Sequence, residues 1–305
     1  MDLRNHPGGN CEIICTCRLS QSPVPTADLQ FEQPFSPENG IGDGTGHFGQ
    51  RLEQPLVFDY SGLWRHTLPL LEVMRSRYGH LPVGGLGGSY GSSVRPEQVA
   101  PFRELGIRTL GEYLTAYKDG QRLPYLRHIS VNRSVPALRA HLHDPAAFRP
   151  NWADHRWLDR FSGPELFIGQ DGSGFGCFHQ DHASVHIGFV QLKGEKEFAL
   201  FPPGDSPYLY RWAGGYFPYQ RRNSWLQFDD AHNVEKYPLL EHTHPRRLLL
   251  KAGQALLLPA DWWHTTRNHG DCISYSIRIV NSTNIGRVIR RHLEGIPRLF
   301  SRARD

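Results

Sequence analysis

The sequence contains no long hydrophobic run, few cysteine residues and no large excess of charge of either sign. No apolar stretch approaches the ~20 residues that a membrane-spanning helix needs, so we expect no membrane span. The five cysteines are an odd number, and the N-terminal residues lack the apolar core of a signal peptide. These absences argue against a secreted disulfide framework and predict a reduced, cytoplasmic protein.

The charge balance gives no reason to expect a nucleic-acid partner. Lys and Arg together number 34 and Asp and Glu number 30, whereas nucleic-acid-binding proteins usually concentrate basic residues in a patch. The Arg-rich tail, residues 285–304, is the exception, and contact with nucleic acid is one interpretation of it. Its apolar residues recur at helical spacing, which favours an amphipathic helix that packs on the domain or pairs two subunits as a homodimer.

The pattern of apolar residues changes along the chain. Residues 63–79, 96–120 and 134–142 have the spacing or the boundary residues of helices. From about residue 165 onward, short segments rich in Phe, Ile, Val, Leu and Tyr alternate with Gly, Pro and Asp, which predicts an all-β barrel or sandwich.

A candidate metal site begins at His179 and Asp181. Residues i and i+2 of a strand point to the same face, so both side chains could reach one ion. His264 ends a later strand-like segment, and two histidines with one carboxylate form the facial triad of non-haem Fe(II) oxygenases. A His-x-Asp pair occurs by chance in a sequence this rich in histidine, so surface polar residues are the alternative interpretation.

An ordered set of motifs identifies a family. PYLRHIS (124–130), ELFIGQDGSGFGCFHQD (165–181), FVQLKGEKEFALFPP (189–203) and DWWHTTRN (261–268) follow one another along the chain. Together they resemble the JmjC/cupin-8 class of 2-oxoglutarate-dependent oxygenases, most closely the small hydroxylases typified by the asparaginyl hydroxylase of hypoxia-inducible factor. The resemblance implies a mainly β fold, a double-stranded β-helix (jelly-roll or cupin barrel) flanked by N-terminal helices and a C-terminal helix.

The same resemblance implies the domain limits. Residues 1–54 would be a partly flexible N-terminal segment, because 36–50 are rich in Gly and polar residues. Residues 55–284 would be the JmjC/cupin-like oxygenase domain, and residues 285–305 the helical tail.

The resemblance also assigns roles to individual residues. His179, Asp181 and His264 would be the iron ligands and the catalytic centre. Lys196 would bind the distal carboxylate of 2-oxoglutarate, and Tyr125 matches a tyrosine that bonds the same carboxylate. A cation in this place suits a dicarboxylate, because a buried carboxylate left unpaired is costly. An exposed strand lysine and a packed core tyrosine are the alternatives.

Gly176 and Arg278 are among the positions that depart from the family pattern. Gly176 stands three residues before the first histidine, where close relatives carry a Thr that supports the cosubstrate. Arg278 replaces the usual Asn near the end of the last strand. Arg278 could bind the distal carboxylate in place of Lys196 or beside it, meet an acidic substrate, or form a salt bridge at the barrel rim.

The implied activity is Fe(II)- and 2-oxoglutarate-dependent hydroxylation that consumes O2 and releases succinate and CO2. Amino-acid side chains of a protein or peptide are the family's commonest substrates. A free amino acid or natural-product intermediate is an alternative substrate. Two other functions stay open: a cupin-type binding module without 2-oxoglutarate turnover, and a cupin metalloenzyme that uses no 2-oxoglutarate.

Overall fold

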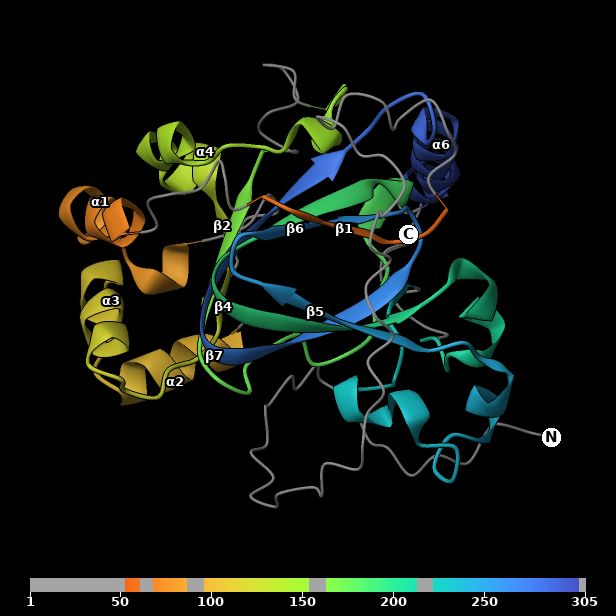
Figure 1. Ribbon diagram of the computed structural model, residues 1–305, viewed down its shortest axis with the longest axis horizontal. Coiled ribbons are helices and arrows are strands. Elements are labelled where there is room, and N and C mark those ends of the chain that lie inside the picture. The colour runs from red at the N-terminus through yellow and green to blue at the C-terminus, as the bar shows by residue number, and fades with distance from the viewer. Residues whose placement is uncertain (1–52, 61–67, 87–95, 154–162, 213–221, 302–305) are drawn as a thin grey trace.

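The computed structural model describes residues 53–60, 68–86, 96–153, 163–212 and 222–301 (Figure 1). Nearly all of the predicted N-terminal segment 1–54, including the three cysteines near its start, therefore lies outside the described residues. Among the described residues, no helix combines the length and the apolar character that a membrane span requires.

The predicted mainly β architecture is confirmed by a 7-stranded sheet in which every recorded pairing is antiparallel. The strands run in the order β1-β6-β4-β7-β3-β2, and β5 pairs with β4 off this path, so the sheet is not closed. Their bounds are β1 Leu56–Asp59, β2 Leu126–Ser130, β3 Glu165–Gly169, β4 His186–Phe201, β5 Arg246–Lys251, β6 Gln254–Leu258 and β7 Trp263–Ile279.

Two long strands, β4 and β7, form the backbone of the sheet. They pair along almost their whole length, with register shifts between Gln191 and Glu195. Gly194 lies in this interval with a φ of 69°, and a Cβ there would come within 2.3 Å of the Asp271 carbonyl oxygen. The interruption divides β4 into a half that pairs with β6 and a half that pairs with β5, as expected of a jelly-roll.

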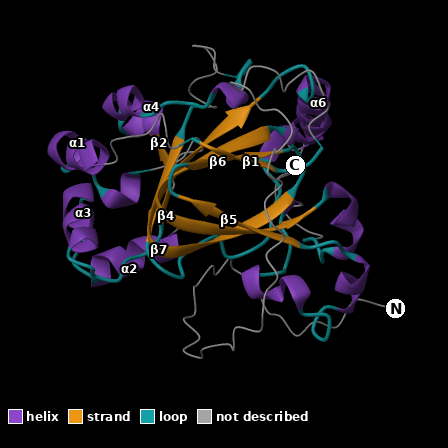
Figure 2. Cartoon of the chain, viewed as in Figure 1, coloured by secondary structure: helices purple, strands orange, loops and turns teal. Residues whose placement is uncertain are grey.

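Helices cover the sheet at its edges, as Figure 2 shows. The α-helices are α1 Leu68–Tyr78, α2 Pro96–Glu104, α3 Leu110–Lys118, α4 Val131–Ser134 and α6 Ile285–Ser301. Short 3-10 helices span Val83–Gly85, Pro136–His141, Ala146–Phe148, His182–Ser184, Pro203–Tyr208, Phe228–His232 and Pro238–His242. The helices expected over 63–79 and 285–304 thus correspond to α1 and α6, whereas 134–142 forms a 3-10 helix.

The segment 96–120 forms two helices because a capping box starts the second one. The Thr109 hydroxyl accepts from the Glu112 N–H, and the Glu112 carboxylate accepts from the Thr109 N–H. Gly120 follows α3 with a φ of 73°, a left-handed conformation that favours glycine. Helices α1 and α3 pack their buried side chains against strands β2, β3, β6 and β7, and this core supports the sheet from outside.

Candidate functional site

His179 and His264 lie directly opposite each other on neighbouring backbone segments. The His179 N–H donates to the His264 carbonyl oxygen at 3.0 Å, and the His264 N–H donates to the His179 carbonyl oxygen at 2.9 Å. This reciprocal pair forms an isolated antiparallel bridge at the start of β7. The two imidazole centroids are 4.3 Å apart, so two residues 85 positions apart in sequence present adjacent rings.

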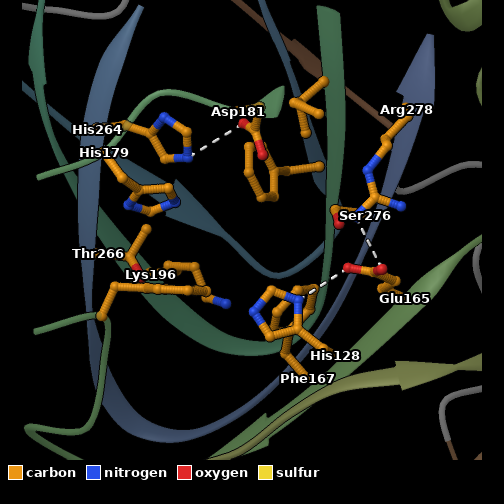
Figure 3. A pocket seen from close by; sticks show the side chains of 13 residues that line it. His128, Glu165, Phe167, His179, Asp181, Lys196, His264, Thr266, Ser276 and Arg278 are labelled. Atoms are coloured by element: carbon orange, nitrogen blue, oxygen red, sulfur yellow. Dashed lines mark hydrogen bonds and ion pairs between the residues drawn. The ribbon is translucent and has the colours of Figure 1, made fainter. Parts of the chain in front are cut away.

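Asp181 completes a group of three potential metal ligands. Its Oδ2 atom lies 3.5 Å from His264 Nε2, and one ligand atom from each of the three residues lies within 4.8 Å of the others. Figure 3 shows the three side chains converging at one end of a pocket. Two imidazoles and one carboxylate suit Fe(II) and related divalent ions. The structure therefore brings together the three residues that the sequence predicted as ligands.

Backbone contacts favour the tautomer of each imidazole in which Nε2 can coordinate a metal ion. His179 Nδ1 lies 3.3 Å from the Cys177 carbonyl oxygen, and His264 Nδ1 lies 3.3 Å from the Trp262 carbonyl oxygen. Since a carbonyl oxygen only accepts, each Nδ1 carries the proton and each Nε2 keeps a lone pair. Burial, and then the neighbouring His264, lowers the pKa of His179 to about 3, so its ring stays neutral at physiological pH.

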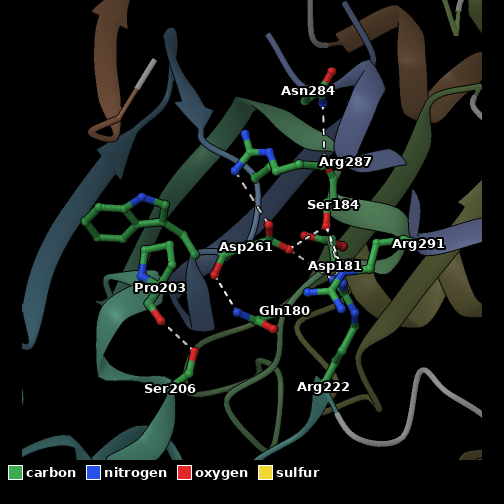
Figure 4. Close-up of polar contacts among 12 residues, drawn as sticks. Gln180, Asp181, Ser184, Pro203, Ser206, Arg222, Asp261, Asn284, Arg287 and Arg291 are labelled. Carbon is green, nitrogen blue, oxygen red and sulfur yellow. Dashed lines mark hydrogen bonds and ion pairs between the residues drawn. The ribbon is translucent and has the colours of Figure 1, made fainter. Parts of the chain in front are cut away.

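A polar network joins the segment that carries Asp181 to the turn at Asp261, which precedes β7 and His264 (Figure 4). The Ser184 hydroxyl donates to Asp261 Oδ1 at 2.8 Å, and Arg222 Nη1 lies 3.4 Å from the same oxygen. Arg222 Nη1 also donates to the backbone carbonyl of Asp181. Because Asp261 precedes His264 by three residues, these contacts fix the position of one ligand turn relative to the other.

The C-terminal helix reaches this network. Arg287 Nη1 lies 3.7 Å from Asp261 Oδ2, and Arg291 Nε donates to the Ser184 hydroxyl at 3.4 Å. Ser184 has a φ of 56°, a left-handed conformation that is sparsely populated for a residue with a side chain. Surrounding contacts must therefore hold the turn, and the Arg291 contact from α6 is one of them.

Lys196 lies in the same pocket as the candidate ligands and is only 3% exposed. Its Nζ donates to Tyr125 Oη at 3.1 Å and to Ser274 Oγ at 2.6 Å. No ion pair joins Lys196 to a carboxylate within the described part of the chain. Burial lowers the pKa of this ammonium to about 8, so an anion brought into the pocket would relieve a desolvated charge. The structure thus brings Tyr125 and Lys196 together, as the sequence predicted.

Arg278, the other predicted cation, has a carboxylate partner. Its Nη2 lies 2.9 Å from Glu165 Oε1, and His128 Nδ1 lies 2.9 Å from Glu165 Oε2. Glu165 is buried, and the Arg278 charge together with the His128 hydrogen bond holds the pKa of its carboxyl well below the usual range despite burial. Of the roles open to Arg278, the salt bridge is therefore present, in the pocket wall opposite Lys196 in Figure 3.

His128 and Glu165 were not identified from the sequence. His128 lies where the β2–β3 pairing shifts register between Leu126 and Ile129, and its φ of 57° is left-handed. The bulge places the imidazole in the pocket while Leu126 and Ile129 stay in the core. The available signal was a charged residue at the start of the apolar strand ELFIG, which marks Glu165 as a buried carboxylate in need of partners.

Comparisons with known proteins agree with this architecture. The sequence pattern of the cupin-like domain family matches residues 90–279. "2-oxoglutarate and iron-dependent oxygenase JMJD4" of Gallus gallus is 26% identical over 195 residues, which cover 62% of this chain and 44% of the relative. "Jumonji C domain-containing protein 5" of Drosophila melanogaster is 26% identical over 218 residues, covering 70% of this chain and 49% of the relative.

A third relative matches a shorter region. "HSPB1-associated protein 1" of Rattus norvegicus is 30% identical over 116 residues, which cover 37% of this chain and 23% of the relative. The matched part of this chain thus spans half the length of these three relatives or less.

Proposed function

The chain belongs to the cupin-like domain family, and from that premise we propose that it is an Fe(II)- and 2-oxoglutarate-dependent oxygenase that hydroxylates an unactivated C–H bond. The observation that carries this proposal is a single pocket with two different ends. One end holds three converging ligand atoms, and the other holds a buried ammonium without a carboxylate partner among the described residues. The names of the JMJD4 relatives support the same cofactor and cosubstrate.

Different residues would bind the iron and the cosubstrate carboxylate at the two ends of the pocket. His179 and His264, through Nε2, and Asp181, through its carboxylate, would hold the iron. Lys196 and Tyr125 would bind the distal carboxylate of 2-oxoglutarate. When bound, iron and 2-oxoglutarate supply O2 activation: one oxygen atom enters succinate, the other becomes the substrate hydroxyl, and CO2 leaves. The aromatic rings of Phe167, Phe175 and Phe189 line part of the wall of this pocket and would exclude water from it.

We propose an amino-acid side chain of a protein or peptide as the substrate. The polar wall of Glu165, Arg278 and His128 lies in the same pocket and offers directional hydrogen-bonding groups to such a side chain. A free amino acid or natural-product intermediate is the alternative. Succinate release measured with peptide pools and with free amino acids separates the two substrates, because only the true class raises the rate above the uncoupled level.

A homodimer through α6 and a cytoplasmic location remain predictions. Ile289 and Leu293 are one helical turn apart and are 52% and 57% exposed, so α6 offers an apolar strip to a second copy. Light scattering of the wild type and of Ile289→Asp checks the dimer: a wild-type monomer would contradict it.

The function is tested without a substrate. Fe(II) and then 2-oxoglutarate are added to the purified protein without oxygen, and the visible metal-to-ligand charge-transfer band is recorded. We expect a band in the wild type and in His242→Ala, whose histidine is exposed, and no band in His179→Ala. A folded, iron-loaded wild type without a band would favour a cupin binding module or a cupin metalloenzyme that uses no 2-oxoglutarate.

A further inference from the structure

One buried hydroxyl in the pocket has no partner. Thr266 is 3% exposed and lines the pocket, and its Oγ1 makes no hydrogen bond. Among the described residues that line the pocket, Thr266 alone has a buried side-chain oxygen or nitrogen without a hydrogen-bond partner. Leaving a buried hydroxyl unpaired is unfavourable, so such a group usually has a ligand or an ordered water as its partner.

The register of β7 places Thr266 between the two ends of the pocket. Thr266 follows His264 by two residues, so both side chains point to the same face of the strand. Asn268, two residues further, pairs with Lys196 across the β4–β7 ladder. The Thr266 side chain therefore lies between the metal ligands and the Lys196 ammonium, as Figure 3 shows.

The segment that covers Thr266 offers it no alternative partner. The Phe175 N–H donates to the Thr266 backbone carbonyl oxygen at 3.1 Å, so it does not donate to the Thr266 hydroxyl. Gly174 approaches so closely that a Cβ there would lie 1.9 Å from the same carbonyl oxygen. Gly176, the next glycine of this segment, has no side chain that could donate or accept.

We propose that the Thr266 hydroxyl donates a hydrogen bond to the bound 2-oxoglutarate and so contributes to cosubstrate affinity. The inference rests on the proposed function and extends it to a residue that neither coordinates the metal nor carries a charge. A hydroxyl is a neutral donor, so it adds a directional contact to the carboxylate that Lys196 attracts electrostatically.

The neighbouring residue provides a matched control. Thr265 is also buried, but its hydroxyl donates to the Phe175 carbonyl oxygen at 2.8 Å and it does not line the pocket. Thr→Val is nearly isosteric, so Thr266→Val removes an unpaired hydroxyl and Thr265→Val removes a paired one. Thr266→Ser keeps the hydroxyl and serves as the conservative variant.

The measurement is an anaerobic titration of the Fe(II)-loaded protein with 2-oxoglutarate, followed by the charge-transfer band. We expect Thr266→Val to raise the Kd roughly 10-fold, the effect of losing one hydrogen bond to a charged group. Thr266→Ser and Thr265→Val should keep the wild-type Kd, and the Fe(II) affinity of all four proteins should be equal.

Thermal unfolding without ligands gives the second readout. Thr265→Val should lower the Tm because its Phe175 partner is left unsatisfied, whereas Thr266→Val should not lower it. A Thr266→Val Kd within about twofold of the wild type would overturn the proposal, as would a lowered Tm with an unchanged Kd, which indicates a structural water. A wild type without a band would refute the proposed function itself, and that result is distinct from a failure confined to Thr266→Val.

Discussion

The two cations of the pocket, Lys196 and Arg278, have opposite surroundings. Lys196 is buried against two neutral hydroxyls, those of Tyr125 and Ser274. Arg278 is paired with the buried carboxylate of Glu165. A buried charge needs a counter-charge. Glu165 supplies the counter-charge of Arg278 within the fold, whereas Lys196 would obtain one from a bound ligand. Under the proposed function, this comparison favours Lys196 over Arg278 as the cation that binds the anionic cosubstrate.

The largest effect is expected at Lys196. Lys196→Met should raise the Kd of 2-oxoglutarate roughly 1,000-fold, or about 4 kcal/mol, because the buried carboxylate loses its charged partner. Calorimetric titration of the metal-loaded protein measures it. Lys193→Met, which removes an exposed lysine of the same strand, should leave the Kd unchanged. A large loss in Arg278→Met with little change in Lys196→Met would reverse the comparison.

Substitution of Arg278 should lower the stability of the protein and leave its affinity for 2-oxoglutarate largely unchanged. Arg278→Met leaves the Glu165 carboxylate buried without its guanidinium, which should lower the free energy of unfolding by about 3 kcal/mol. Denaturant unfolding measures the loss, and Arg278→Met/Glu165→Gln should recover much of it because the charge is removed. Arg267→Met breaks an exposed pair with Asp229 and should cost less than about 1 kcal/mol. A double variant as unstable as the single one would show that the pair is not what stabilises this wall.

The sequence predicted the positions of the metal ligands and Lys196 better than that of Arg278. His179, Asp181 and Lys196 lie in local motifs whose residue types and order could be recognised along the chain. The contact of Glu165 with Arg278 depends on the β3–β7 register, in which Glu165 pairs with Ser276 and meets Arg278 diagonally. No local pattern encodes that register, because it is set by the whole sheet.

Two further features could not be predicted, for related reasons. The reciprocal backbone pair of His179 and His264 is a non-local bridge outside regular strand pairing, so neither residue shows it in sequence. The inward side chain of His128 depends on a bulge that reverses the alternation expected along β2. Most helices were predictable because spacing and boundary residues such as Gly120 are local signals, whereas the capping box at Thr109 was not identified.

The smallest expected effect is a pH dependence of the Kd of 2-oxoglutarate, which distinguishes Lys196 from Arg278 without any substitution. Burial lowers the pKa of Lys196 to about 8, whereas an arginine stays charged throughout the accessible range. The ammonium that attracts the carboxylate is therefore present below pH 8 and lost above it, so the Kd of 2-oxoglutarate should rise about tenfold between pH 7 and pH 9. Titrations in buffers of different ionisation enthalpy should show proton uptake on binding near pH 8.5, because the bound anion favours the charged lysine. An affinity that stays flat over this interval, with metal binding held saturated, would contradict a carboxylate held by a lysine whose pKa is near 8.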